Sequence, residues 1–132
     1  MTQTLDTPAQ APAQRAGRWL ADFEEALHAR DVARAAGMFA ASSFWRDLVS
    51  FTWNITTVEN PAGVTDLLTE TLERTDPSGF AVEEPPDEAD GVTTAWFTFE
   101  TAVGRGRGLV RLVEEDGVPK AWTFLTTLYE LK

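Results

Sequence analysis

The sequence predicts an α+β domain in which helices cover one face of a curved antiparallel sheet. Two observations support this fold class. Apolar residues recur at helical spacing in the first part of the chain, whereas the segments after residue 78 are rich in Val, Thr, Phe, Trp and Leu. Residues 1–14 contain hardly a large apolar side chain and cannot offset their ordering entropy, so we predict a disordered tail there. Residues 15–132 are long enough to form one domain with its own core.

Three helices are expected in the first part of the domain. An apolar stripe that starts after Arg15 predicts the first helix, which ends at the segment HARD. Asp31 is well placed to cap a second, shorter helix whose stripe reaches Phe39. The third helix follows Asn60, which can cap it, and stops before Pro77.

Four segments predict an antiparallel meander, and they read GFAVEE, GVTTAWFTFETAV, RGLVRLVEE and VPKAWTFLTTLYELK. An earlier strand is expected from about Phe51, with Phe51, Trp53 and Ile55 on one buried face. The later strands are apolar on both faces, whereas a sheet with one face in water would alternate more cleanly. We therefore predict a homodimer in which a second copy of the chain covers the outer face of the sheet.

Composition excludes several classes of function. The net charge of −10 disfavours binding to nucleic acid or to an anionic membrane, because both would repel the average surface. The chain has no cysteine, and its one histidine, His28, falls on a solvated helix face, so we predict no metal site. No segment approaches a membrane-spanning length, and the N-terminus does not read as a signal peptide. We therefore expect a cytoplasmic protein whose partners are small molecules or proteins.

The segment VGRGRGLVRL contains three glycines that resemble a nucleotide-binding loop at first sight. Their G-x-G-x-G spacing between two strands differs from the G-x-G-x-x-G that a dinucleotide loop requires between a strand and a helix, so we predict no cofactor. A period of two would place the glycines on one strand face, as a bare strip against which a ring or another backbone can lie. The acidic run at residues 83–91 reads as a solvated hairpin loop.

Several motifs resemble a known superfamily. The segment ALHARDVARAAGMFA, an aromatic-x-Asp turn, a G-x-x-x-LL helix and a long-stranded meander resemble the nuclear transport factor 2-like superfamily, which also contains ketosteroid isomerases, scytalone dehydratases and polyketide cyclases. The segments FWRDLVSFTWNITT, AWFTFETAVGRGRG and KAWTFLTTLYELK are similar to the N-terminal domain of bacterial flavin-containing monooxygenase-like proteins. The resemblance implies a cone-like, cystatin-like fold with three N-terminal helices on a curved sheet. It also implies a flavoprotein domain in the parent protein as a partner.

These features predict a non-catalytic accessory domain or a domain that binds a small hydrophobic ligand. The alternative is a small isomerase, dehydratase or cyclase that acts on a hydrophobic ring substrate. Indole and phenyl rings suit the wall of such a pocket. We expect the pocket to be lined by seven aromatic residues: Trp19, Phe23, Phe39, Trp45, Trp53, Trp96 and Tyr129.

Asp47 is the candidate catalytic residue. The resemblance implies that it opens toward the cone-shaped cavity, where ketosteroid isomerases carry their general base. The isomerases also use a tyrosine and a protonated acid, but this chain has only Tyr129 and no acid near Leu109. Three roles for Asp47 therefore remain open: a general base, a polar contact at the pocket rim, or a structural turn or salt bridge.

Overall fold

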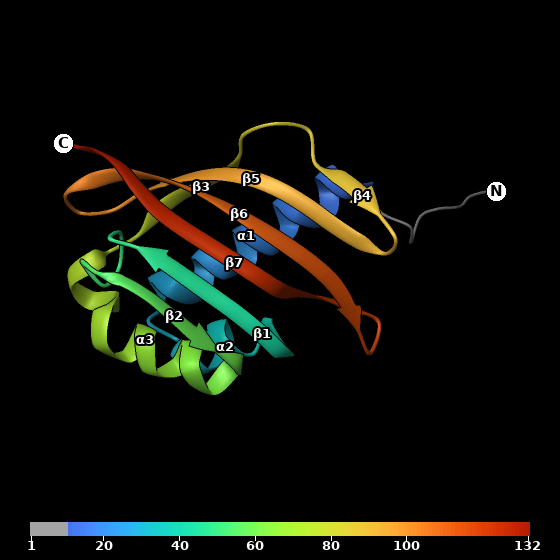
Figure 1. The fold of residues 1–132 in the computed structure, drawn as a ribbon, viewed down its shortest axis with the longest axis horizontal. Helices are drawn as coiled ribbons and strands as arrows, with labels where there is room; N and C mark the ends of the chain where they lie inside the picture. Colours follow the sequence, from blue (N-terminus) through green and yellow to red (C-terminus); the bar gives the residue numbers. More distant parts are fainter. Residues whose placement is uncertain (1–10) are drawn as a thin grey trace.

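Three helices pack against a single seven-stranded sheet in the computed structural model, which describes residues 11–132 (Figure 1). The helix α1 contacts β3 and β5, whereas α3 contacts β1 and β2. The strand order is β2-β1-β7-β6-β5-β3, and β4 pairs with β5. The elements are α1 (Pro12–His28), α2 (Val32–Ala36), β1 (Phe39–Leu48), β2 (Ile55–Glu59), α3 (Asn60–Thr75), β3 (Ser78–Val82), β4 (Asp87–Ala89), β5 (Val92–Glu100), β6 (Gly104–Glu115) and β7 (Val118–Leu131).

The α+β fold class is confirmed, but the order of elements and the strand directions differ in part from the prediction. The strands β5, β6 and β7 form the expected antiparallel meander. In contrast, β1 pairs with β7 in parallel, with Trp45 opposite Phe124, so the sheet is mixed. The helix α3 follows β1 and β2, and the three helices therefore do not all precede the sheet.

The ends of the first two helices also differ from the prediction. The helix α1 begins at Pro12, because proline fits the first helical turn, where a missing N–H costs nothing. Residues 12–14 are thus helical, and residues 1–10 of the expected tail lie outside the described part of the chain. Asp31 caps α2 as predicted, and its side chain accepts a hydrogen bond from the N–H of Arg34 at 3.1 Å. Phe39 opens β1 instead of ending α2.

The strand expected from Phe51 is wrong. The polypeptide forms β1 before this point, turns through residues 49–54 and enters β2 only at Ile55. Trp53 and Ile55 are 54% and 63% exposed rather than buried. The backbone of Val49 and Trp53 has φ of 77° and 59°, a left-handed conformation that β-branched and bulky residues rarely adopt. The turn must therefore be held by contacts that offset this strain.

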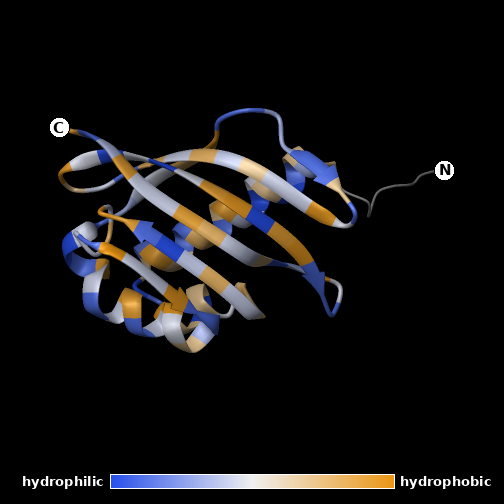
Figure 2. Cartoon of the chain, in the orientation of Figure 1, coloured by the Kyte–Doolittle hydropathy of each residue, from blue (hydrophilic) through white to orange (hydrophobic). Residues whose placement is uncertain are grey.

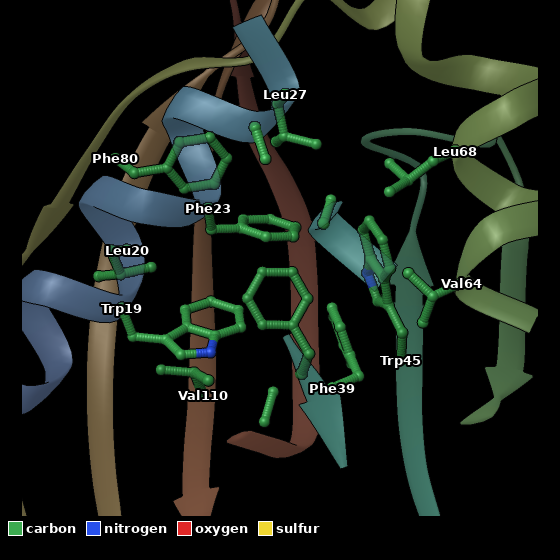
Figure 3. Packing of buried hydrophobic residues seen from close by; sticks show 14 of the residues in the cluster. Trp19, Leu20, Phe23, Leu27, Phe39, Trp45, Val64, Leu68, Phe80 and Val110 are labelled. Atoms are coloured by element: carbon green, nitrogen blue, oxygen red, sulfur yellow. The ribbon is translucent and has the colours of Figure 1, made fainter. Parts of the chain in front are cut away.

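Aromatic rings fill the space between the helices and the inner face of the sheet. Figure 3 shows Trp19 and Phe23 from α1 directed toward Phe39 and Trp45 from β1. Trp19 stacks on Phe23 with ring centroids 4.9 Å apart, and Phe39 stacks on Trp45 at 5.9 Å. Phe124 from β7 lies within 5.6 Å of all four of these rings. The interior of the cone is thus a packed core.

The glycines of β6 contribute to this packing. A Cβ atom on Gly106 would lie 2.3 Å from the ring of Phe99, and one on Gly108 would lie 2.3 Å from the ring of Phe97. Both glycines face inward, so the bare strip expected from the sequence is confirmed, and its occupants are rings of the neighbouring strand β5.

Along the long strands, hydrophobic and hydrophilic residues succeed one another at short intervals (Figure 2).

Candidate functional site

The Asp47 side chain lies near the end of β1 and has no exposed surface. Its Oδ1 atom accepts hydrogen bonds from Ser50 Oγ at 2.5 Å and Thr126 Oγ1 at 2.7 Å. Its Oδ2 atom accepts from the backbone N–H and the hydroxyl of Thr52, at 2.8 and 2.9 Å. The N–H of Phe51 lies 3.0–3.1 Å from both oxygens. Donors of the protein itself therefore occupy the whole carboxylate.

Thr126 links Asp47 to Trp45. The indole Nε1–H of Trp45 donates to Thr126 Oγ1 at 2.9 Å, and the Thr126 hydroxyl donates in turn to Asp47. Thr126 lies opposite Asp47 in the parallel pairing of β1 with β7. This buried polar chain joins two strands and the turn at residues 49–54, and each polar group in it has a partner. Sequence reasoning missed Thr126, although a threonine between the apolar residues of a central strand was a usable signal.

A position at the pocket rim, one of the three roles left open by the sequence, does not agree with the full burial of the Asp47 side chain. Arg46, its neighbour in sequence, points to the other face of the sheet and donates to Thr57 Oγ1 at 3.3 Å. Asp47 makes no ion pair with any residue of the described chain. This geometry favours the role of a structural turn, because the carboxylate accepts hydrogen bonds from backbone N–H groups of the strained segment 49–54.

Four of the seven residues expected to line a pocket are core residues. Trp19, Phe23, Phe39 and Trp45 are at most 3% exposed and contact one another through their rings. They come together as predicted, but they fill the interior of the cone because their rings stack or meet edge to face. A hydrophobic ligand could enter this region only by displacing them.

The other three expected pocket residues lie elsewhere. Trp53 and Tyr129 are 54% and 56% exposed and line a shallow hollow of about 300 Å³ together with Val49 and Leu131. Trp96 lies on the outer face of β5, where the guanidinium of Arg107 sits 4.4 Å from the centre of its ring. A hydrogen bond from Arg107 to Glu83 raises the pKa of this arginine. The alternation of side chains along the strands turns Trp96 and Tyr129 away from the core, whereas Trp53 lies in the turn at residues 49–54. The seven residues therefore do not share one pocket.

A different hollow, which we call the basic groove, lies between α1, the end of α2 and the start of β7. It has a volume of about 310 Å³. Its apolar lining consists of Trp19, Met38, Val118 and Pro119, and its charged lining consists of Arg15, Arg18, Asp22, Arg34 and Lys120. Four cations and one carboxylate thus surround an apolar floor. Of the predicted pocket residues, only Trp19 lines this groove, with its Nε1–H donated to the Met38 carbonyl at 3.2 Å.

Carboxylates outside the groove bind two of its cations. Arg15 Nη2 donates to Glu88 at 2.7 Å, and Arg34 Nη2 donates to Glu25 at the same distance. The second contact raises the pKa of Arg34. Within the groove, Arg18 lies 3.8 Å from Asp22.

Lys120 differs from the three arginines of the groove. Its Nζ donates to the backbone carbonyl of Gly37. It has no carboxylate partner among the residues that the structure describes, and the residue as a whole is half-buried. Sequence reasoning gave no signal for the groove, because its lining combines residues 15–38 with residues 118–120, which are far apart in the sequence.

Residues 11–132 were also compared with the requirements of a metal site and of a membrane-spanning helix. Within that range, no group of three or more His, Cys, Asp or Glu side chains could hold a metal ion. His28 is solvent-exposed, as expected, and its Nε2 lies 3.6 Å from Glu24. No helix in the same range has the length and apolar character that a membrane crossing requires.

Comparisons with known proteins find similarity in structure. No family model matches the chain, and no curated protein matches it. A nuclear transport factor 2-like protein with a cystatin-like fold from Novosphingobium aromaticivorans superposes with a TM-score of 0.66 at 8% identity, over 87% of this chain and 80% of that one. A ketosteroid isomerase-like protein from Erwinia carotovora atroseptica gives 0.70 at 8% identity, over 87% and 95%. A hexachlorocyclohexane dehydrochlorinase from Novosphingobium barchaimii gives 0.66 at 14% identity, over 91% and 89%.

These identities are too low to transfer an activity, and they establish the fold alone. Nothing in the comparisons links the chain to the N-terminal domain of flavin-containing monooxygenase-like proteins, so that part of the sequence resemblance is unsupported. The structural neighbours agree with a cone of helices on a curved sheet. The chain therefore has the nuclear transport factor 2-like, cystatin-like fold.

Proposed function

We propose that the chain is a non-catalytic domain that binds a small hydrophobic ligand in the basic groove. One observation carries this proposal: the interior of the cone is filled with rings, whereas the groove offers an apolar floor and about 310 Å³ of space. That volume falls at the lower end of the range of roughly 300–1,000 Å³ for small-molecule sites. The floor combines an indole, a thioether and two small apolar side chains, which suit a flat or flexible apolar body.

The hydrogen bonds of Asp47 argue against the alternative, an isomerase, dehydratase or cyclase with Asp47 as its general base. A general base must reach the proton that it abstracts, at a separation of about 2.6–3.2 Å or through one water. Five donor groups of the protein already occupy this carboxylate, and the side chain has no exposed surface. Catalysis by Asp47 would first require the turn at residues 49–54 to open. Proteins of this fold include a dehydrochlorinase, so an enzymatic role for Asp47 needs a test. A large loss of stability on substitution of Asp47 would favour the structural role over the general base.

The ligand proposal can be tested with N-phenyl-1-naphthylamine, an uncharged probe that fluoresces in apolar sites. We expect saturable binding that weakens by about tenfold in Val118→Glu, because the substitution places a carboxylate on the floor of the groove. Val103→Glu is the matched control, since Val103 is a similarly exposed valine at the turn between β5 and β6. Equal affinity in the two variants, or no saturable binding by the wild-type chain, would contradict the groove as the ligand site.

We also propose a homodimer through the outer face of the sheet. Trp96, Leu109 and Leu125 form one row across β5, β6 and β7 on that face, and they are half-buried in the single chain. Arginine and aromatic residues together are common at protein interfaces. Light scattering at micromolar concentration should give the mass of a dimer, and Leu109→Glu should give that of a monomer. A monomer mass for the wild-type chain would remove this proposal.

A flavoprotein partner and a cytoplasmic location remain predictions from the sequence. The comparisons give no support to the former, and the dimer proposal does not depend on either.

A further inference from the structure

We infer that the basic groove selects amphipathic anions, which carry an apolar body and a carboxylate, sulfonate or phosphate tip, and that Lys120 binds the tip. This inference rests on the proposed function, because it takes the groove as the ligand site and adds the chemical class of the ligand. Four lines of evidence support it: the charge of the groove, the pairing of its cations, the position of Lys120 and the lack of free donors on the floor.

The charge of the groove is opposite to that of the whole protein. The chain carries a net charge of −10, with 21 acidic and 11 basic residues. Four of those basic residues line the groove with a single carboxylate, Asp22. An acidic surface repels anions at long range, so a local excess of positive charge marks the place where an anion is most favoured. Lysine and arginine stems also cover apolar surface, which lets the same side chains contact both ends of an amphipathic ligand.

The cations of the groove differ in how far other groups compensate their charge. Arg15 and Arg34 each contact a carboxylate oxygen at 2.7 Å, and both of these carboxylates lie outside the groove lining. Arg18 faces Asp22 at 3.8 Å, a distance typical of a weak surface pair. Lys120 alone in this set has no carboxylate within ion-pair distance among the described residues. A ligand anion would therefore bring the largest gain at Lys120, since it replaces no existing ion pair there.

The position of Lys120 leaves donors for such a ligand. An ammonium group has three N–H donors, and only the contact with the Gly37 carbonyl is present in the structure. That contact anchors the side chain at the end of α2, next to Met38 of the floor. The hydrogen bond of the ammonium group lies at an exposed position, so an anion can reach its other donors and form a charge-assisted hydrogen bond.

The floor itself cannot select a polar tip. The indole N–H of Trp19 is already donated to the carbonyl of Met38, and the remaining floor residues, Val118 and Pro119, have apolar side chains. Polar recognition in the groove therefore depends on its cations. The proposed ligand lies with its body on the floor and its anionic tip toward Lys120.

A pair of probes separates this inference from the proposed function. N-phenyl-1-naphthylamine and 8-anilinonaphthalene-1-sulfonate share one ring system, and only the second carries a sulfonate. The wild-type chain should bind the sulfonate probe about tenfold more tightly, the factor expected for one charge-assisted contact. Lys120→Met keeps most of the apolar stem and should abolish this preference, so that the variant binds the two probes with equal affinity.

Lys132→Met is the matched control. Lys132 is the other lysine of the chain and pairs with Glu100 at 3.0 Å, outside the groove. Its substitution removes the same net charge and should leave the preference for the sulfonate probe intact. Equal loss of preference in the two variants would indicate a general charge effect and would overturn the role of Lys120.

Each outcome decides between the proposed function and the inference about Lys120. If the wild-type chain does not bind the uncharged probe, the proposed function is contradicted. Binding of both probes with equal affinity, or a preference that survives Lys120→Met, leaves the proposed function in place and overturns the inference. If Lys120→Met does not fold, the wild-type preference is measured against sodium chloride. It should then fall with ionic strength while binding of the uncharged probe stays constant, and a salt-independent preference would overturn the inference.

Discussion

The turn around Asp47 and the basic groove both place a charged side chain beside a tryptophan, but they differ in how that charge is satisfied. In the turn, five donor groups surround the carboxylate, and the neighbouring Trp45 is linked to it through Thr126. In the groove, Lys120 has one carbonyl contact and no carboxylate partner in the described structure. A charged residue among aromatic residues therefore favours a ligand site only when part of its hydrogen-bonding capacity remains unused.

The largest expected effect is that of Asp47→Asn. The substitution removes the charge and turns part of the acceptor into a donor that faces N–H and O–H groups. We expect the free energy of unfolding to fall by about 3 kcal/mol, as for the loss of one partner in a buried charged network. Urea denaturation measures it.

Asp66→Asn provides the control for this prediction. Asp66 is exposed on α3, and we expect a change of less than about 0.5 kcal/mol for a surface substitution. Similar effects of the two substitutions would show that Asp47 is not a structural clamp. That result would favour the two other roles for Asp47, a polar contact at a pocket rim or a general base.

The next largest effect tests whether the interior of the cone is closed. Gly108→Ala would bring a Cβ atom to 2.3 Å from both the Phe97 ring and the Leu125 carbonyl oxygen, so ring and backbone must move. Overpacking of this kind costs about 1–3 kcal/mol. Gly17→Ala on α1 is the matched substitution, because its Cβ would meet nothing within 4 Å, and it should stabilise the helix by up to about 1 kcal/mol. If both substitutions are neutral by thermal denaturation, the interior has free volume after all.

An effect of similar size is expected for Thr126→Val, which keeps the shape but removes the hydroxyl between Trp45 and Asp47. The indole N–H of Trp45 would lose its acceptor, and Asp47 would lose one of its donors. We expect a loss of about 1–3 kcal/mol in unfolding free energy, the cost of an unsatisfied buried donor. Thr127→Val, one residue along the strand on the opposite face, is the control and should change stability little. Equal effects of the two threonine substitutions would mean that the link through Thr126 carries no energy.

Local patterns predicted much of the fold. The stripe of α1, the cap at Asp31 and the glycine strip of β6 each depend on residues a few positions apart, and each is confirmed. The strand Phe39–Leu48 was not predicted, because its sequence FAASSFWRDL does not alternate regularly between apolar and polar residues. Its parallel pairing with β7 joins segments from opposite halves of the chain, and no local pattern reports such pairing.

The candidate site was predictable only in part. The sequence correctly grouped Trp45 with Asp47 but could not show that Thr126 and the N–H groups of the turn would occupy the carboxylate. The groove escaped prediction, since Arg15 and Lys120 belong to the first helix and the last strand. The sequence alone also does not show whether the charge of Lys120 is compensated by a carboxylate.

The indole N–H signals give the most direct test of where a ligand binds. Trp19 lines the groove, whereas Trp45 lies in the polar chain that ends at Asp47. In a ¹H–¹⁵N correlation spectrum titrated with N-phenyl-1-naphthylamine, the Trp19 Nε1–H signal should shift in a saturable way, and the Trp45 signal should stay in place. A shift of the Trp45 signal with no change at Trp19 would place the ligand inside the cone near Asp47 and would contradict binding in the basic groove.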